Sequence, residues 1–206
     1  MGYAAGSMPS ETFDDAYYER FYLNPKTRVY GPDEHQHLAQ YVFSFAAWNL
    51  IRIDKVLDVG AGIGLWRDWI EKQAPKVDYT GIEYSRAMCQ QHGFTRADIA
   101  TYRSKQRYDL IICQGVLQYL SDDDVLRALK NIARMSQGLV FFEALTQADL
   151  AERADQDRTD THVRIRSGDF YREAFSKHFV SVGAGLYWPK DYELPFWELD
   201  VAGTQP

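Results

Sequence analysis

Short runs of apolar residues alternate along the chain with longer segments in which apolar residues recur every three or four positions. The runs predict buried strands at 55–59, 77–85, 93–99, 110–113 and 138–144. The periodic segments predict amphipathic helices at 33–51, 65–73, 86–92, 121–133 and 167–175, the first with Asp33 as its N-cap. Strands that alternate with helices predict an α/β fold in which helices cover both faces of a mostly parallel sheet.

Two further apolar segments close the chain, at 179–188 and 196–201. Because no helix separates them, these strands must pair antiparallel, as a hairpin with a long loop. With the five strand–helix units before them, they predict a three-layer αβα sandwich around a seven-stranded sheet whose last strand is antiparallel. The polar segment 146–160 predicts helix and loop, and 161–165 a short extended piece.

The charge balance argues against a nucleic-acid partner, since the net charge is −6. Arginines in the segment 153–172 are interleaved with aspartates, which predicts a solvated mixed surface; they are Arg153, Arg158, Arg164, Arg166 and Arg172. Two cysteines, Cys89 and Cys113, are too few for a disulfide scaffold, and no apolar stretch is long enough for a membrane span. We therefore expect a protein of the reducing cytoplasm, without a membrane partner.

The most informative stretch is 55–65, which reads Lys-Val-Leu-Asp-Val-Gly-Ala-Gly-Ile-Gly-Leu. A buried strand breaks into a turn with Gly60, Gly62 and Gly64 and then opens a helix, whose first N–H groups favour an anionic or negatively polarised ligand group. The spacing is G-x-G-x-G, and Leu65 stands at the position where a dinucleotide fingerprint, G-x-G-x-x-G, has its last glycine. A tight turn without a ligand is the alternative, but three glycines cost backbone entropy that packing alone does not require.

This stretch, with Asp58 before its glycines, closely resembles motif I of the class I S-adenosylmethionine-dependent methyltransferases. The resemblance implies a Rossmann-like sheet and S-adenosylmethionine as cofactor, held by Asp58, Gly60, Ala61, Gly62 and Gly64. Glu83 ends the next expected strand, about twenty residues on, where an acid can accept hydrogen bonds from ribose hydroxyls.

Further cofactor contacts follow from the same resemblance. It implies that Tyr84 flanks the adenine, that Asp98 accepts from its amino group, and that the backbone N–H of Ile99 contacts the ring. The segment 108–120 resembles the fourth-strand motif of small-molecule methyltransferases, which ends beside the reactive methyl group and places Gln114 near the methionine part of the cofactor.

The sequence predicts the catalytic groups less clearly than the cofactor-binding residues. Many relatives carry histidine where this chain has Tyr119, which leaves the identity of any base open. Tyr119, Glu143 and His162 are the candidates, although His162 also fits a surface histidine. The chain has neither the Asn/Asp-Pro-Pro-Tyr/Phe motif of exocyclic-amine and glutamine methylation nor the Pro-Cys nucleophile of C5-pyrimidine methylation.

An aromatic segment precedes this core. Tyr17, Tyr18, Phe21 and Tyr22 crowd one short helix that Asn24-Pro25 should end. The helix either caps the core or forms a lid over the cofactor, with Tyr22, Arg28 and Tyr30 as candidates to reach the methionine carboxylate. Aromatic residues near the C-terminus fit either an apolar acceptor pocket or the core; they are Tyr187, Trp188, Phe196 and Trp197.

The sequence thus predicts a single-domain enzyme that transfers a methyl group to the oxygen, nitrogen or carbon of a small molecule. We expect a tail and possible lid at 1–32, a cofactor-binding core at 33–145, and a substrate-side insertion with the last strand pair at 146–206; residues 1–12 should be flexible. His35 and His37 lack further ligands nearby, so we expect no metal. The alternatives are a non-catalytic binding module of the same fold, a protein or RNA methyltransferase, or a nicotinamide-dependent oxidoreductase.

Overall fold

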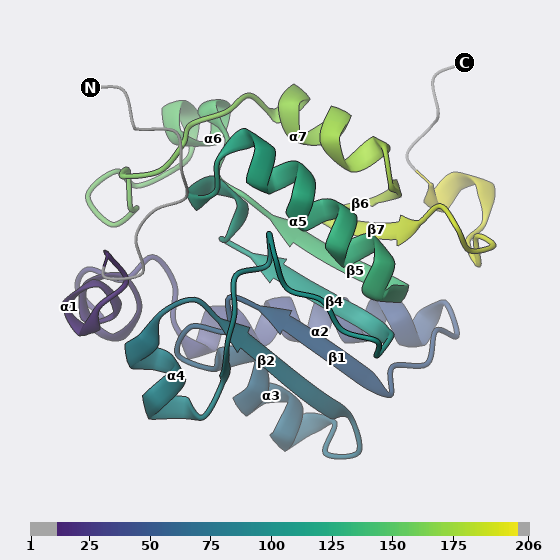
Figure 1. The fold of residues 1–206 in the computed structure, drawn as a ribbon, viewed down its shortest axis with the longest axis horizontal. Helices are drawn as coiled ribbons and strands as arrows, with labels where there is room; N and C mark the ends of the chain where they lie inside the picture. Colours follow the sequence, from purple (N-terminus) through teal and green to yellow (C-terminus); the bar gives the residue numbers. More distant parts are fainter. Residues whose placement is uncertain (1–11, 202–206) are drawn as a thin grey trace.

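Seven strands form one sheet through the centre of the molecule, in the order β3-β2-β1-β4-β5-β7-β6 (Figure 1). The computed structural model describes residues 12–201, so all of the expected flexible tail but its last residue lies outside them. The strands are β1 Lys55–Val59, β2 Asp78–Glu83, β3 Thr95–Arg96, β4 Tyr108–Gln114, β5 Ser136–Glu143, β6 Phe179–Gly183 and β7 Leu186–Pro189. Pairs among β1 to β5 are parallel, and β7 is antiparallel to both β5 and β6.

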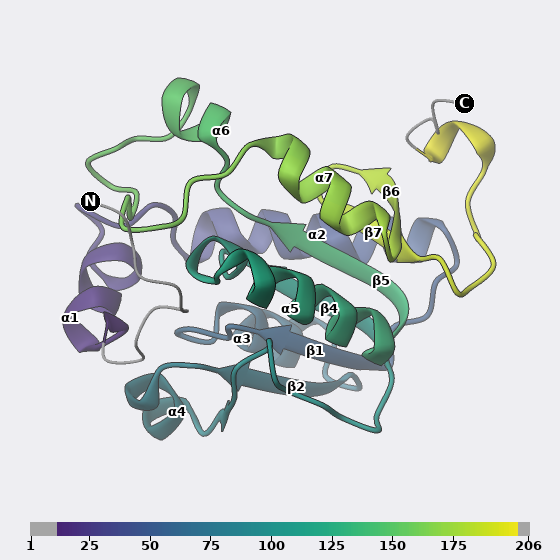
Figure 2. The same ribbon diagram turned by 45° about the horizontal axis from the view of Figure 1, so that its top comes forward.

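Helices cover both faces of this sheet, which confirms the three-layer α/β prediction. One core cluster joins the sheet to α5 (Asp122–Met135) and α7 (Gly168–Ser176), and a second joins the opposite face to α2 (Pro32–Trp48) and α3 (Leu65–Gln73). Figure 2 shows α5 and α7 on the near side of the sheet and α2 behind it. The shorter helices α1 (Asp15–Tyr18), α4 (Arg86–His92) and α6 (Gln147–Glu152) lie toward the end of the sheet at which β1, β2 and β4 terminate.

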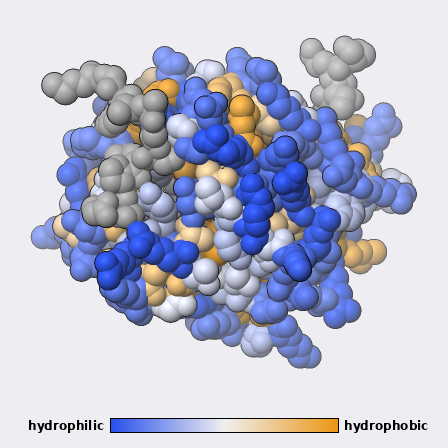
Figure 3. All heavy atoms as spheres, in the orientation of Figure 1, coloured by the Kyte–Doolittle hydropathy of each residue, from blue (hydrophilic) through white to orange (hydrophobic). Residues whose placement is uncertain are grey.

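The outer surface follows the amphipathic pattern of the helices. Hydrophilic residues cover most of the face in Figure 3, interrupted by small apolar areas. None of the helices in residues 12–201 is both long enough and apolar enough to span a membrane.

The prediction for the last two strands was wrong in its details. Both strands lie within the expected first one, because the chain reverses tightly at Ala184 and Gly185, whose φ angles are +46° and +82°. Segment 196–201 contains only the 3₁₀ turn Glu198–Asp200, and the side chains of Trp197 and Leu199 are 82% and 97% exposed. Segment 196–201 pairs with no strand within residues 12–201, although its residues alternate, because β6 and β7 of the hairpin already complete the sheet.

Other boundaries also differ from the predictions. Helix α2 begins one residue before Asp33, since Pro32 occupies its first position and Gly31 is its N-cap; the N–H of Gly31 donates to the Glu34 carboxylate at 2.8 Å. Strand β3 is limited to two residues, and 161–165 is not a strand. The N-cap of α5 is Ser121, whose hydroxyl accepts from the N–H of Asp124.

Candidate functional site

The site lies where the sheet changes direction. After β1 the chain adds β2 and β3 on one side, and it then crosses back to place β4 on the other side of β1. The crevice beyond the carboxyl ends of two such strands is the usual ligand position in open α/β sheets. Here it opens into a cavity of about 1010 Å³, counting its mouth. Its wall contains most of the predicted cofactor-binding residues: Tyr22, Asp58, Gly60, Ala61, Gly62, Glu83, Tyr84, Asp98, Ile99 and Gln114.

The glycine turn forms the floor of this cavity. The N–H groups of Gly60 and Ala61 donate to the carbonyl of Ile82 at 2.9 and 3.1 Å, which ties the turn to β2. Gly60 has a φ of +75°, and a Cβ there would collide with the side chain of Val116. Only glycine fits this position without strain. Gly64 differs from the prediction, since it is the left-handed N-cap of α3 and does not line the cavity.

Glu83 is the most tightly held polar group of the site. Its buried carboxylate accepts from the backbone N–H groups of Gly62 (2.8 Å), Tyr84 (2.7 Å) and Ser85 (2.7 Å). The hydroxyl of Tyr18 donates to it at 3.3 Å, the longest of the four contacts. Three of these donors reach Oε1 and one reaches Oε2, so Oε2 keeps a free lone pair. A ligand hydroxyl can therefore bind at Oε2, and it can reach Oε1 by replacing the Tyr18 hydroxyl.

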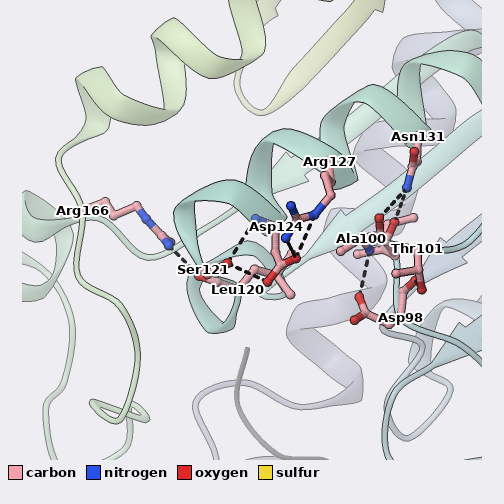
Figure 4. Close-up of polar contacts among 10 residues, drawn as sticks. Asp98, Ala100, Thr101, Leu120, Ser121, Asp124, Arg127, Asn131 and Arg166 are labelled. Carbon is pink, nitrogen blue, oxygen red and sulfur yellow. Dashed lines mark hydrogen bonds and ion pairs between the residues drawn. The ribbon is translucent and has the colours of Figure 1, made fainter. Parts of the chain in front are cut away.

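The loop after β3 brings Asp98 and Ile99 to the cavity. Asp98 Oδ1 accepts from the N–H of Ala100 at 2.8 Å, which orients the carboxylate. Asn131, on α5, donates to the carbonyls of Ile99 (2.7 Å) and Ala100 (3.0 Å) and holds this loop against the helix (Figure 4). Sequence reasoning missed Asn131, although a polar residue between Leu129 and Ile132 on the apolar face of the helix was a visible signal.

The opposite end of the cavity, near β1 and β4, carries mixed polar groups. Asp58 is buried and accepts from the Tyr79 hydroxyl at 2.6 Å, and burial raises the pKa of its carboxyl to about 7. Gln114 accepts from the indole N–H of Trp66 at 2.9 Å and donates to Glu143 at 3.3 Å. Glu143 stands at the exposed end of β5 outside the cavity wall, and desolvation by surrounding protein raises the pKa of its carboxyl.

His35, from the first turn of α2, also lines this end, which sequence reasoning did not foresee. It packs edge-on against Trp66, with ring centroids 4.8 Å apart. Burial lowers the pKa of its imidazole to about 4, so the ring is neutral at pH 7. Its Nε2 is buried and has no hydrogen-bond partner among residues 12–201, so it can serve a polar group of a ligand.

The N-terminal aromatic segment covers the cavity from the side. It comprises α1 and the π-helix Glu19–Leu23, which lie beyond the carboxyl ends of the strands (Figure 1). Tyr17, Tyr18 and Tyr22 line the cavity, as does Tyr30. Arg28 does not, because its guanidinium packs against the backbone of Gly31. The position of this segment fits the lid alternative.

The three base candidates occupy different places. Tyr119 lines the cavity, and its hydroxyl lies 2.7 Å from that of Tyr17 and donates to Asp160 at 3.0 Å. His162 lies outside the cavity wall with its side chain 76% exposed, and its Nδ1 is 3.4 Å from Asp160 Oδ1. Asp160, which sequence reasoning missed, thus joins two of the candidates. Glu143 reaches the site only through Gln114.

Arg166 corrects the view of the arginine segment as a solvated surface. Its guanidinium is buried, donates to the carbonyls of Leu117 (3.1 Å) and Leu120 (2.5 Å), and pairs with Asp122 at 2.8 Å. Figure 4 shows it reaching across to the start of α5. It therefore fastens the segment that carries Asp160 to the short turn that carries Tyr119.

The C-terminal aromatic residues do not line the cavity. Tyr187 packs on Phe142 and Phe175, and Trp188 packs on Phe196, whereas Trp197 is exposed. Three of the four therefore contribute to the core, and the acceptor-pocket interpretation of this group was wrong.

Comparison with known proteins places this geometry in a family. A family model described as a methyltransferase domain matches residues 28–178, most of the chain. No curated protein is similar enough in sequence to count as a relative.

Solved structures share the fold at low identity. A protein of Pyrococcus horikoshii superposes with a TM-score of 0.62 at 14% identity, over 86% of this chain and 100% of that one. An S-adenosylmethionine-dependent methyltransferase of Clostridium acetobutylicum gives 0.57 at 14% identity, over 81% and 85%. The N-methyltransferase NodS of Bradyrhizobium japonicum, solved with S-adenosyl-L-homocysteine, gives 0.55 at 18% identity, over 73% and 76%.

Proposed function

The chain belongs to the methyltransferase-domain family, and from this we propose that it transfers the methyl group of S-adenosylmethionine to a small-molecule acceptor. The observation that carries the proposal is the buried Glu83 carboxylate, which faces the glycine turn at the point where the sheet changes direction. An acid there accepts from ribose hydroxyls, while the turn lets a ligand approach the backbone.

The residues of the cavity fit this cofactor from end to end. Tyr84 and Ile99 would hold the adenine, and Asp98 would accept from its amino group. Glu83 would accept one ribose hydroxyl at Oε2, and a second at Oε1 would replace the Tyr18 hydroxyl. At the other end of the cavity, Asp58, Gln114 and the imidazole of His35 would offer polar partners to the methionine part.

The chemistry asks little of the protein beyond alignment. S-adenosylmethionine supplies a methyl group that its sulfonium already activates. The chain's residues hold the acceptor in line with that group and exclude water, which accounts for much of the rate in such displacements. Aromatic rings of segment 13–22 form part of the cavity wall, where their apolar surface helps to exclude water.

A cavity whose wall includes the N-terminal aromatic segment favours a small acceptor over a macromolecule. The net charge of −6 disfavours RNA. Both cysteines are free thiols, which supports the expected action in the cytoplasm.

Calorimetric titration tests the proposal. We expect S-adenosylhomocysteine to bind the folded protein with micromolar affinity, and NADH to give no heat of binding at the same concentration. Methyl-labelled S-adenosylmethionine should then transfer its label to members of an acceptor panel. A folded protein that binds no S-adenosylhomocysteine would overturn the proposal, and tight binding of NADH would favour an oxidoreductase instead.

A further inference from the structure

The wall of the cavity beside Tyr119 is unusually rich in tyrosine. The rings of Tyr17 and Tyr22 lie 6.1 Å apart, and Phe13 stands edge-on to both Tyr17 and Tyr119 at 5.2 and 5.0 Å. The hydroxyl of Tyr17 meets that of Tyr119 at 2.7 Å, and Tyr119 donates onward to Asp160. Aromatic faces and phenol oxygens therefore surround this part of the cavity, with a carboxylate directly behind them.

The charge of the cavity is one-sided. Asp58, Glu83 and Asp98 line it, whereas none of the described residues in its wall is a lysine or an arginine. The side chain of Asp160 is only 9% exposed, so water screens its charge weakly. A carboxylate or phosphate acceptor would lose its hydration here without gaining a lysine or arginine partner from the wall, which is costly. An ammonium gains the π-electrons of the tyrosines and the Asp160 carboxylate behind Tyr119.

We propose that the acceptor is an amine, which binds as an ammonium against Tyr17, Tyr22 and Tyr119, with Asp160 as the positioning residue that holds Tyr119 and receives the proton. This inference rests on the proposed methyl transfer and names its acceptor class. It also gives a role to the contact between Tyr119, Asp160 and His162, which cofactor binding does not use.

The proton must leave before the methyl group moves, because an ammonium has no lone pair. Tyr119 takes one N–H proton and passes its own hydroxyl proton to Asp160. The nitrogen lone pair then forms the N–C bond, the C–S bond breaks, and its electron pair stays on sulfur. Asp160 releases its proton on its outer side, where His162 is 3.4 Å away and exposed to water.

Matched probes test this inference on the intact chain saturated with S-adenosylhomocysteine. The probes are propylamine, phenethylamine and octylamine, each compared with the alcohol and the carboxylate of the same carbon skeleton. We expect at least one amine to bind ten times more tightly than both counterparts by calorimetry, and the same amine to be methylated when S-adenosylmethionine is supplied. If no amine exceeds its counterparts, or if alcohols are methylated equally well, the inference is wrong.

Variants separate the role of Asp160 from a structural one. In Asp160→Asn the preference for amine over alcohol should fall about tenfold, with the Kd for S-adenosylhomocysteine within twofold of wild type. Tyr119→Phe, which breaks the same link, should reproduce the loss. Asp157→Asn removes an exposed charge three residues away and should change neither quantity. An unchanged preference for amine over alcohol in Asp160→Asn would overturn the role given to Asp160. If the wild-type protein does not bind S-adenosylhomocysteine, the proposed function itself is wrong.

Discussion

Glu83→Gln is the sharpest test of the cofactor site, because it changes the charge of one buried group and almost none of its volume. In the folded chain Oε1 accepts from the N–H groups of Tyr84 and Ser85, and Oε2 accepts from that of Gly62. Glutamine keeps one of these two oxygens. If the amide oxygen stays with Tyr84 and Ser85, the new NH₂ group faces the N–H of Gly62 and a hydrogen bond is lost.

The expected loss of affinity follows from these contacts. A hydrogen bond to a charged acceptor contributes about 1.5–3 kcal/mol, and the ribose engages the carboxylate with at least one. We therefore expect Glu83→Gln to weaken S-adenosylhomocysteine binding by about 2 kcal/mol, roughly 30-fold. Calorimetry measures the Kd, and thermal unfolding of the free proteins reports any change in stability.

A matched variant controls for charge. Glu71→Gln removes an exposed carboxylate on α3, away from the cavity wall, and should leave the Kd unchanged. The reasoning would be refuted by a folded Glu83→Gln protein whose Kd lies within threefold of the wild-type value, because the ribose then makes no contact with this carboxylate.

Four further substitutions test other parts of the structure. Tyr18→Phe removes the hydroxyl that competes for Glu83, so S-adenosylhomocysteine should bind about fivefold more tightly by calorimetry. Arg166→Met removes the donor to the Leu120 carbonyl, leaves the Leu117 carbonyl with only the N–H of Leu120, and should lower the free energy of unfolding in urea by about 3 kcal/mol. Asn131→Asp replaces the NH₂ group that donates to the carbonyls of Ile99 and Ala100 with a carboxylate oxygen that repels them. This change should lower the free energy of unfolding by about 2 kcal/mol and measurably weaken S-adenosylhomocysteine binding. The fourth substitution is Asp58→Asn. Burial raises the pKa of the Asp58 carboxyl to about 7 in the folded chain, so the contribution of this group to stability is complete below about pH 4 and is lost as the pH rises to 7. Relative to Asp58→Asn, the free energy of unfolding of the wild type in urea should therefore fall between about pH 4 and about pH 7 and stay level above about pH 7.

Exposed counterparts provide the controls. Arg172→Met removes a guanidinium that is 70% exposed and pairs with an exposed Asp169, so it should cost less than about 1 kcal/mol. Gln90→Glu adds a charge on the exposed side of α4 and should not alter the Kd. If these controls lose as much stability or affinity as the buried variants, burial and contact geometry do not explain the effects.

The central strands and the glycine turn were predictable because their signals are local. Buried parallel strands read as continuous apolar runs, and each strand–helix unit specifies itself within about thirty residues. The hairpin of β6 and β7 was not predictable in this way, because Ala184 adopts a left-handed backbone that its residue type does not announce. The apolar alternation at 196–201 was misleading for a related reason, since a strand needs a partner as well as a pattern.

The two halves of the candidate site differ for the same physical reason. Gly60, Gly62 and Glu83 lie in or near one strand–turn–helix unit, so their spacing along the chain reflects their spacing in the cavity. Tyr17 and Tyr119 are 102 residues apart, and Tyr119 and Asp160 are 41 residues apart. Their contact depends on the packing of three separate segments.

The acceptor side of the site can therefore vary while the cofactor side stays constant. Arg166 holds the segment of Asp160 against the turn of Tyr119 through backbone carbonyls, which exist whatever side chains the turn carries. The hydrogen bonds of Arg166 do not depend on the side chains that they position, so residues 17, 119 and 160 can change while these bonds remain. On this argument, exchanging Asp160 should alter acceptor selectivity far more than stability, whereas exchanging Arg166 should lower stability and loosen every contact of the segment together.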